Sequence, residues 1–127
     1  MNNYKGRGDY MNIATSYIAN FKKYNGRVPI CIMRWKLKYF NGIYYYSLAP
    51  SWKLLFDYKH NNITFETFHD EMIKQLEKLD SKKIFTRLEK FGNNIVLLGT
   101  CKDYDHCHRK IVADWLSKEL NIEIKEL

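Results

Sequence analysis

The chain has 127 residues, of which 46% are hydrophobic and 16% aromatic, and its formal net charge is +7. This length fits one domain and the apolar content is enough for a hydrophobic core, which excludes a disordered or low-complexity chain. Because no apolar run approaches the ~18 residues that span a bilayer, and residues 1–12 lack the apolar centre of a secretion signal, we expect a cytoplasmic protein without a membrane partner.

The N-terminal part of the chain predicts two strands with a short helix between them. Residues 1–9 are polar and contain glycine, so we expect a loose segment ahead of the domain. A strand is predicted over residues 10–14, followed by a polar turn at Thr15-Ser16-Tyr17 and an amphipathic helix over residues 18–24. The apolar, β-rich run 28–33 then predicts a buried strand.

The middle of the chain changes from an irregular segment to a series of helices. Residues 34–49 are rich in aromatics and lysines, which predicts a long loop with a small ribbon over residues 43–46. Ser51 is a candidate cap for a first helix, and Thr64 is a candidate cap for a second that runs to about Leu79. A third helix is predicted to begin at Asp80 or Ser81 and to end at Gly92.

The C-terminal part completes an alternation of strands and helices. Residues 95–98 predict a buried strand, Cys107 to Leu120 a helix, and the apolar positions Ile122 and Ile124 a short terminal strand. Strands separated by helices indicate an α/β fold. We therefore expect a single α/β domain over residues 10–127, with a mostly parallel sheet of three to five strands flanked by helices.

The ends of the predicted strands are the candidate functional positions. Open α/β sheets bind ligands beyond the carboxyl ends of their strands. In this chain those ends carry Thr15-Ser16-Tyr17, Arg34-Trp35 and the segment from Thr100 to Arg109. These three segments are expected to meet at one edge of the sheet.

The segment from Cys101 to Arg109 holds two of the three cysteines, both close to histidines. An odd number of cysteines in this arrangement argues against a disulfide framework and for a reduced protein. In the first turn of the predicted helix, Cys107 would lie among unpaired backbone N–H groups that favour the thiolate. The same groups, together with Arg109, form a candidate anion pocket. The pattern therefore predicts either a nucleophilic thiolate or a phosphate or carboxylate site.

Other types of site fit this segment less well. A cysteine phosphatase loop needs a shorter spacing than the seven residues between Cys101 and Arg109. His106, His108 and the two cysteines are of the types that bind zinc, but adjacent residues rarely point at one metal, so we expect neither a metal nor a cofactor. In a purely structural alternative, Arg109 pairs with Asp105 or with the C-terminus.

Positive charge is concentrated in the N-terminal half. Residues 1–59 hold ten Lys and Arg against two Asp, whereas residues 60–127 hold eleven against twelve Asp and Glu. Basic and aromatic residues alternate between Arg34 and Tyr39, which is typical of a surface that stacks bases and contacts phosphates, and also of an edge strand guarded by lysines. The charge indicates an anionic partner, for which a nucleotide or nucleic acid is the first candidate and an acidic protein surface the second.

Four short motifs occur in an order that is similar to the domain-of-unknown-function 488 family. The motifs are Thr15-Ser16-Tyr17 with Ala19-Asn20; Ile32, Arg34, Lys38 and Phe40; Leu48-Ala49-Pro50 with Leu54-Leu55 and Tyr58-Lys59; and Val96-Leu97-Leu98 followed by Cys107-His108-Arg109 and Ala113, Trp115 and Leu116. The chain departs from the family pattern at Lys36-Leu37, where two prolines are common, and at Lys102, where an acidic residue is usual. The resemblance implies a single α/β domain and a shared site, and no particular reaction.

The site that the resemblance implies consists of Ser16, Arg34, Lys38, Cys107, His108 and Arg109. The leading hypothesis is a phosphate-bearing ligand, a nucleotide or nucleic acid, held in a cleft between Arg34 and the Cys107-His108-Arg109 helix N-terminus. Tyr17, Trp35 or Tyr39 would stack on a base. A second hypothesis is a cysteine-dependent enzyme acting on such a substrate, and a third is a basic interaction module without a small-molecule ligand.

In the enzyme hypothesis Cys107 is the nucleophile and His106 or His108 is the acid–base partner. Neighbouring residues on a helix project about 100° apart, so Cys107 and His108 are not expected to form a hydrogen bond with each other. His106 precedes the predicted helix and is the freer of the two histidines.

Overall fold

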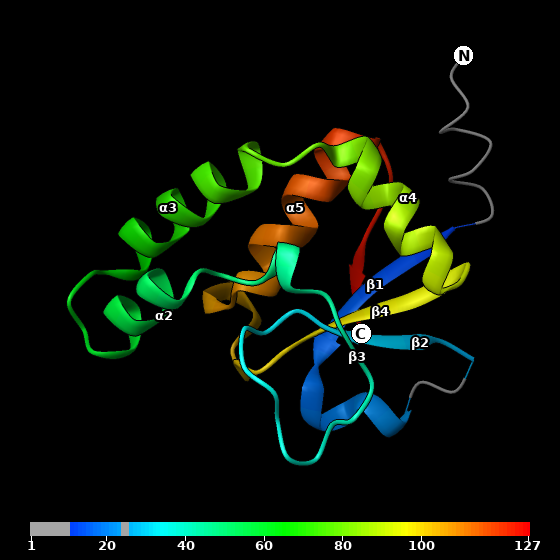
Figure 1. Ribbon diagram of the computed structural model, residues 1–127, viewed down its shortest axis with the longest axis horizontal. Helices are drawn as coiled ribbons and strands as arrows, with labels where there is room; N and C mark the ends of the chain where they lie inside the picture. The colour runs from blue at the N-terminus through cyan, green and yellow to red at the C-terminus, as the bar shows by residue number, and fades with distance from the viewer. Residues whose placement is uncertain (1–10, 24–25) are drawn as a thin grey trace.

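The computed structural model describes residues 11–23 and 26–127. It contains a five-stranded sheet in which all neighbouring strands are parallel, in the order β3-β2-β4-β1-β5 (Figure 1). The strands are β1 (Asn12–Tyr17), β2 (Val28–Cys31), β3 (Ile43–Tyr44), β4 (Asn94–Gly99) and β5 (Lys125–Glu126). The expected α/β class with a parallel sheet flanked by helices is confirmed.

The central strand β4 explains why the sheet is parallel and buried. Its four apolar residues, 95–98, are completely buried, which is the continuous apolar run that a strand covered on both faces requires. It pairs with β1 from Asn12↔Asn94 to Tyr17↔Gly99, and on its other side with β2. The carboxyl ends of β1, β2 and β4 therefore lie at the same edge.

The helices have the caps that the sequence indicates. They are α2 (Trp52–Lys59), α3 (Phe65–Glu77), α4 (Ser81–Phe91) and α5 (His108–Leu120), with 3-10 turns η1 (Ile18–Lys23), η2 (Tyr46–Leu48) and η3 (Tyr104–His106). Side chains of Ser51, Thr64 and Asp80 accept hydrogen bonds from the first turns of α2, α3 and α4. Each such cap stabilises its helix by about 1 kcal/mol.

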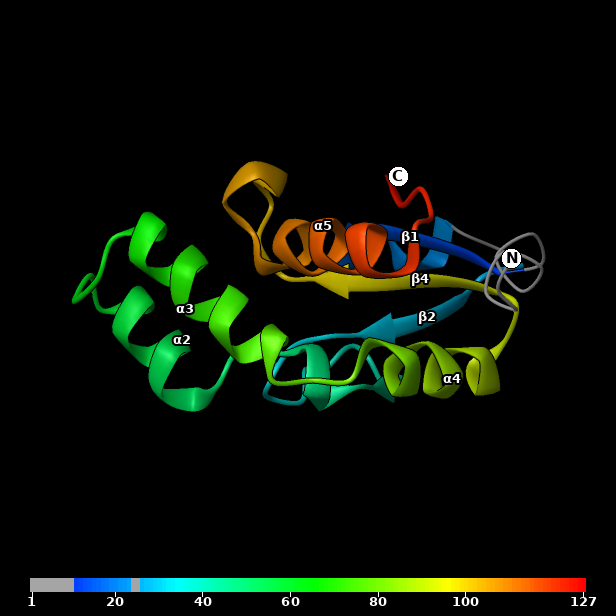
Figure 2. The same cartoon turned by 90° about the horizontal axis from the view of Figure 1, so that it is seen from above.

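Apolar residues on the two faces of β4 belong to two separate clusters. Ile95 and Leu97 pack with the apolar faces of α4 and α5, while Val96 and Leu98 pack with η1 and the loop after β2. The views agree: α4 and α5 lie side by side over the sheet in Figure 2, and the opposite face carries η1 in Figure 1. Helices α2 and α3 form a hairpin that extends beyond the carboxyl ends of the strands (Figure 1).

Three local predictions are wrong in detail. Thr15-Ser16-Tyr17 is not a turn but the end of β1, with Thr15 and Ser16 buried, because pairing with β4 continues to Gly99. The terminal strand is Lys125–Glu126, just after Ile122 and Ile124, which are half-buried. Cys107 is not in the first turn of α5 but is its N-cap, with extended backbone angles.

Some expectations concern residues outside the described ranges. The loose segment 1–9 and the first residue of the predicted 10–14 strand are among these, as is the end of the predicted 18–24 helix. In the parts of the chain that the structure describes, no helix is long and apolar enough to span a membrane.

Candidate functional site

The candidate site lies where α5 begins, next to the carboxyl ends of β2 and β4. Gly99, the last residue of β4, allows this close approach. A Cβ atom added there would lie 2.9 Å from the Cys107 sulfur and 3.2 Å from Cδ of Arg109. The first distance is shorter than real Cβ contacts and the second is tight, so a side chain at this position would push the Cys107 sulfur away from its place at the start of α5.

Cys107 and His108 form a contact that the sequence argument did not expect. The Cys107 Sγ atom lies 3.9 Å from Nδ1 of His108, at the outer limit of a sulfur hydrogen bond. The helical rule of about 100° between neighbours fails here because Cys107, with φ −118° and ψ 143°, is extended rather than helical. The expectation that these two side chains point apart is therefore wrong.

A buried hydrogen bond fixes the orientation of His108. Its Nε2 atom lies 2.6 Å from the backbone carbonyl oxygen of Ile32, just after β2. A carbonyl only accepts, so Nε2 carries the hydrogen, and in the neutral ring Nδ1 is an acceptor that faces the Cys107 sulfur. The end of β2 therefore determines which ring nitrogen of His108 meets the thiol.

The environment of Cys107 favours its thiolate. A hydrogen bond from the Cys101 thiol is the main cause of a lowered Cys107 pKa, which His108 and the backbone amide of Arg109 lower further against the opposing effect of burial. The Cys101 pKa is raised, first by its hydrogen bond to Cys107 and then by burial. In this pair Cys107 holds the negative charge and Cys101 donates.

Arg109 is a structural residue at the base of the site. Its side chain is fully buried and forms an ion pair with Glu126 of β5, with Nη2 2.8 Å from Oε2. Its Nη1 donates to the backbone carbonyl of Cys101, and its guanidinium lies 5.3 Å from the centre of the Tyr104 ring. Thr15 also donates a hydrogen bond, of 2.8 Å, to Glu126. The acidic partner is thus Glu126 rather than Asp105.

Arg34 is held by three backbone carbonyl oxygens. Its Nε donates to Pro50 at 3.0 Å, and its Nη2 donates to Ala49 at 3.0 Å and to Tyr46 at 3.1 Å. These bonds connect the end of β2 to the segment that leads into α2. Most of the guanidinium therefore faces protein carbonyls rather than an open cleft.

The other predicted site residues lie around this centre at different depths. Ser16 is buried in β1 opposite Leu98, Tyr17 is half-buried at the end of that strand, and Lys38 is exposed in the loop after β2. His106 is exposed; its Nδ1 lies 2.7 Å from Asp103 and its ring packs edge-on against Phe65 at 4.9 Å. Its described partners thus belong to η3 and α3 rather than to the thiol pair.

Three contributors to the site were not among the predicted site residues. Cys101 donates to Cys107, the Ile32 carbonyl orients His108, and Glu126 neutralises Arg109. Cys101 had a usable signal, since it follows a buried strand and precedes the other cysteine by a short loop. A backbone carbonyl leaves no signal in a sequence, and the partnership of Glu126 depends on where the last strand joins the sheet.

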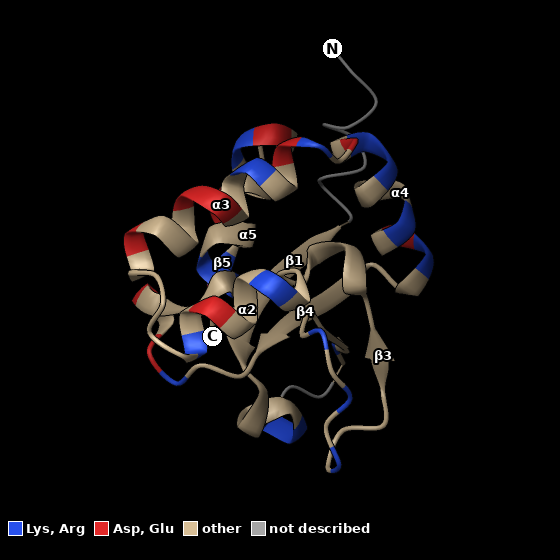
Figure 3. Cartoon of the chain, turned by 60° about the vertical axis from the view of Figure 1, so that its left-hand side comes forward, with Lys and Arg blue, Asp and Glu red and all other residues tan. Residues whose placement is uncertain are grey.

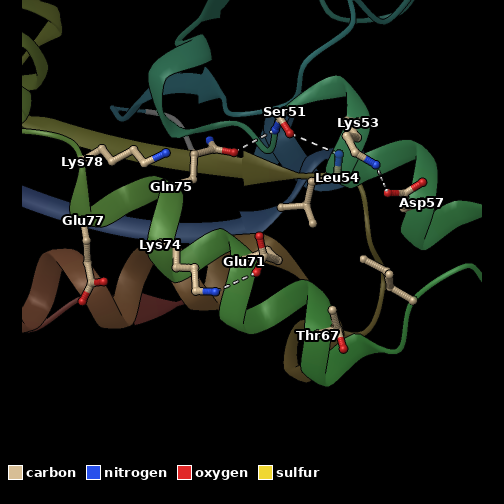
Figure 4. Close-up of a pocket in the computed structure, with 11 residues that line it drawn as sticks. Ser51, Lys53, Leu54, Asp57, Thr67, Glu71, Lys74, Gln75, Glu77 and Lys78 are labelled. Carbon is tan, nitrogen blue, oxygen red and sulfur yellow. Dashed lines mark hydrogen bonds and ion pairs between the residues drawn. The ribbon is translucent and has the colours of Figure 1, made fainter.

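A groove of about 790 Å³ lies elsewhere, along α2 and α3 (Figure 4). Charged side chains of both signs line it, including the ion pairs Lys53–Asp57 and Lys74–Glu71. Cys107, His108 and Arg109 are not among its lining residues, so the groove and the thiol centre are distinct. Within residues 11–23 and 26–127, no group of three or more Cys, His, Asp or Glu side chains is arranged to hold a metal ion.

Comparison with known proteins gives one match. A family model described as the active DUF488-N3 subclade, where DUF denotes a domain of unknown function, matches residues 27–120. This range includes β2, the Arg34 loop, the α2–α3 hairpin and the whole of α5. No curated protein and no solved structure matches the chain significantly.

Proposed function

The chain belongs to the DUF488 family, in the active DUF488-N3 subclade, and we propose that it is a cysteine-dependent enzyme with Cys107 as its nucleophile. The observation that carries the proposal is the contact of 3.9 Å between the Cys107 sulfur and Nδ1 of His108. The buried bond from His108 to Ile32 supports it, because it holds the ring in the orientation that a base or acid needs. The word "active" in the description of the subclade agrees with a catalytic role.

In this proposal the sulfur of Cys107 donates an electron pair to an electrophilic carbon or phosphorus of the substrate. The bond to the leaving group breaks, and the leaving group takes the proton that Nδ1 of His108 received from the Cys107 thiol when the sulfur ionised. A water then gives a proton to Nδ1, its oxygen bonds to the carbon or phosphorus, and the bond to sulfur breaks, which restores the thiolate. Cys101, by donating to Cys107, keeps the resting sulfur ionised.

The geometry favours this mechanism over a simple grip on phosphate. Arg109 is already neutralised by Glu126, and Arg34 already donates to three carbonyl oxygens. An anion would have to displace these partners. A phosphate-bearing ligand would thus depend on Lys38 and on the N-terminus of α5, and in this proposal it is the class of substrate on which Cys107 acts.

A substrate cannot reach the Cys107 sulfur without a movement of the protein around it. The residue is 0% exposed, whereas Cys101 beside it is partly exposed. A substrate must therefore reach the sulfur by a local opening of the segment around Cys101, as expected for a site that excludes water during the reaction.

Alkylation of the three cysteines in the intact chain tests the proposal. Iodoacetamide labelling at a series of pH values, followed by peptide mass analysis, should show Cys107 reacting well below the ordinary thiol pKa of about 8.5. Cys31 is a buried control whose pKa is raised by burial to about 11, and it should stay unlabelled at neutral pH.

The variant His108→Gln should shift the labelling midpoint of Cys107 to higher pH, because the favourable interaction with the imidazole is lost. Equal labelling of Cys31, Cys101 and Cys107, or a midpoint for Cys107 near that of a free thiol, would overturn the proposal. A thermal unfolding curve for the variant separates a change in reactivity from a loss of fold.

A further inference from the structure

Large aromatic side chains are exposed along one side of α2. Trp52 is 59% exposed and Phe56 is 56% exposed, and their spacing of four residues places them on the same side of the helix. Soluble domains rarely leave two such rings in water side by side, so an exposed pair of this kind indicates a binding surface.

Each of the two rings stacks on a further side chain. The Trp35 ring stacks on Trp52 with centroids 6.0 Å apart and planes at 25°, and Phe56 stacks on His60 at 4.0 Å and 27°. The ammonium group of Lys59 lies 3.9 Å from the centre of the Trp35 ring. We name Trp35, Trp52, Phe56, Lys59 and His60 the α2 aromatic strip.

The strip lies in the basic half of the molecule. Residues 11–23 and 26–59 hold eight Lys and Arg, and their only acidic residue, Asp57, already pairs with Lys53 at 2.9 Å. Lys36 and Lys38, in the loop that carries Trp35, are exposed. In Figure 3 the basic residues follow this loop, while acidic residues gather on α3. The charge around the strip is complementary to a polyanion.

We propose that the α2 aromatic strip is a docking surface for single-stranded nucleic acid. Its bases would stack on the open faces of Trp52 and Phe56, and its phosphates would contact Lys36, Lys38 and Lys59. Proteins that bind single strands without sequence preference stack bases on aromatic rings and contact phosphates with basic side chains. The positive charge around the strip favours this polyanion over a protein partner, because eight Lys and Arg face only one acidic residue in this part of the chain.

This surface goes beyond the proposed catalysis and does not depend on it, although one end of the strip approaches the thiol centre. The positive charge of Lys59 opposes the rise in the Cys101 pKa. Burial raises the pKa of Tyr58, and the charges of Cys101 and Cys107 raise it further. A strand docked on α2 would therefore pass close to the site of the proposed chemistry.

Fluorescence anisotropy with a labelled oligothymidine tests the proposal on the intact chain. The double variant Trp52→Ala with Phe56→Ala keeps every charge and removes the stacking surface. Loss of stacking on two rings is expected to weaken binding by roughly tenfold or more at fixed salt. Binding should also weaken as salt increases, because phosphate contacts release counterions.

The matched control removes charge where there are no exposed rings. Lys82→Gln with Lys83→Gln neutralises two exposed lysines on α4, a helix that carries none of the exposed large apolar side chains described. This control should change the affinity by no more than about twofold. An equal loss of affinity in both variants would show that the binding depends only on non-specific charge and would overturn the proposal. Absence of binding to the unaltered chain would overturn it as well.

The variant Cys107→Ser keeps the two proposals separate, since it should bind the oligothymidine as the unaltered chain does. Binding without any unusual reactivity of Cys107 would leave the docking surface standing and reject the enzyme. Thermal unfolding of the α2 variant checks its fold, which we expect to survive because both rings are exposed.

Discussion

At the scale of single residues, Cys107 is a buried group whose charged form is favoured. Its sulfur is removed from water, yet the hydrogen bond from Cys101 and the neighbouring His108 favour its charged form. A charge in such a place is stable only because several donors converge on it. His108 in turn depends on one carbonyl, that of Ile32, so the chemistry of the thiol is linked to the end of β2.

The lowered pKa of Cys107 predicts how stability changes with pH. Between the folded and unfolded pKa values the unfolded chain holds a proton that the folded chain lacks, so Cys107 makes the free energy of unfolding rise with pH. This contribution is complete above the unfolded thiol pKa of about 8.5 and is lost as pH falls through the lowered folded value. Its slope is at most about 1.4 kcal/mol per pH unit.

Urea unfolding of Cys107→Ser between pH 5 and pH 8 measures this contribution. The variant should show a flatter pH profile than the unaltered chain over this range. Cys31→Ser is the matched control: it removes a buried thiol whose pKa is raised, and it should keep the slope while lowering stability. Parallel profiles for Cys107→Ser and the unaltered chain would show that Cys107 is protonated in the folded state.

At the scale of elements, two arginines attach peripheral segments to the sheet. Arg109 holds β5 through Glu126, and Arg34 holds the start of α2 through carbonyl oxygens. In both cases a cation that the sequence suggested for ligand binding is used to join elements that are distant in the chain.

The ion pair with Glu126 predicts a specific loss of stability. In Glu126→Gln the fully buried guanidinium of Arg109 loses its counter-charge. The Glu126 side chain is 24% exposed, so the substitution itself buries no new charge. We expect the free energy of unfolding to fall by about 3 kcal/mol, measured by urea denaturation. Glu123→Gln, an exposed change just before the strand, should alter it by no more than about 0.5 kcal/mol.

Equal effects of Glu126→Gln and Glu123→Gln would show that β5 is not held by this pair. Fraying of β5 would let water reach Arg109 and reduce the effect, so hydrogen exchange at the amide of Leu127, which donates to Thr15, provides a second readout.

The contacts of Arg34 predict a second loss, at the start of α2. Arg34→Met keeps the apolar stem but leaves three carbonyl oxygens without their donor, which should cost about 2 kcal/mol of stability. Lys38→Met, in the same loop but exposed, is the control and should be nearly neutral. If Arg34 instead grips a ligand anion, its variant would lose binding while keeping its melting temperature.

At the scale of the whole molecule, charged residues gather in separate places. Basic residues follow the loop after β2 and line α4, while acidic residues gather on α3 (Figure 3). The thiol centre lies at the carboxyl edge of the sheet, where β2 and β4 end and α5 begins.

The sequence by itself determined the α/β class, the run of four helices and the buried central strand. These features follow from local patterns: capping residues at Ser51 and Thr64 and apolar spacing that repeats within one element. It also predicted a site at the carboxyl edge around Cys107-His108-Arg109, because a helix that begins after a buried strand is a local signal.

Only the tertiary structure decided what those residues contact. Thr15 and Ser16 are strand rather than turn because β4 continues beside them, and Arg109 meets Glu126 because β5 joins the far edge of the sheet. The pairing of Cys107 with His108 required the extended backbone of a helix cap and a carbonyl from a different strand. Partners that are distant in sequence leave no periodic pattern, so their contacts are set by packing.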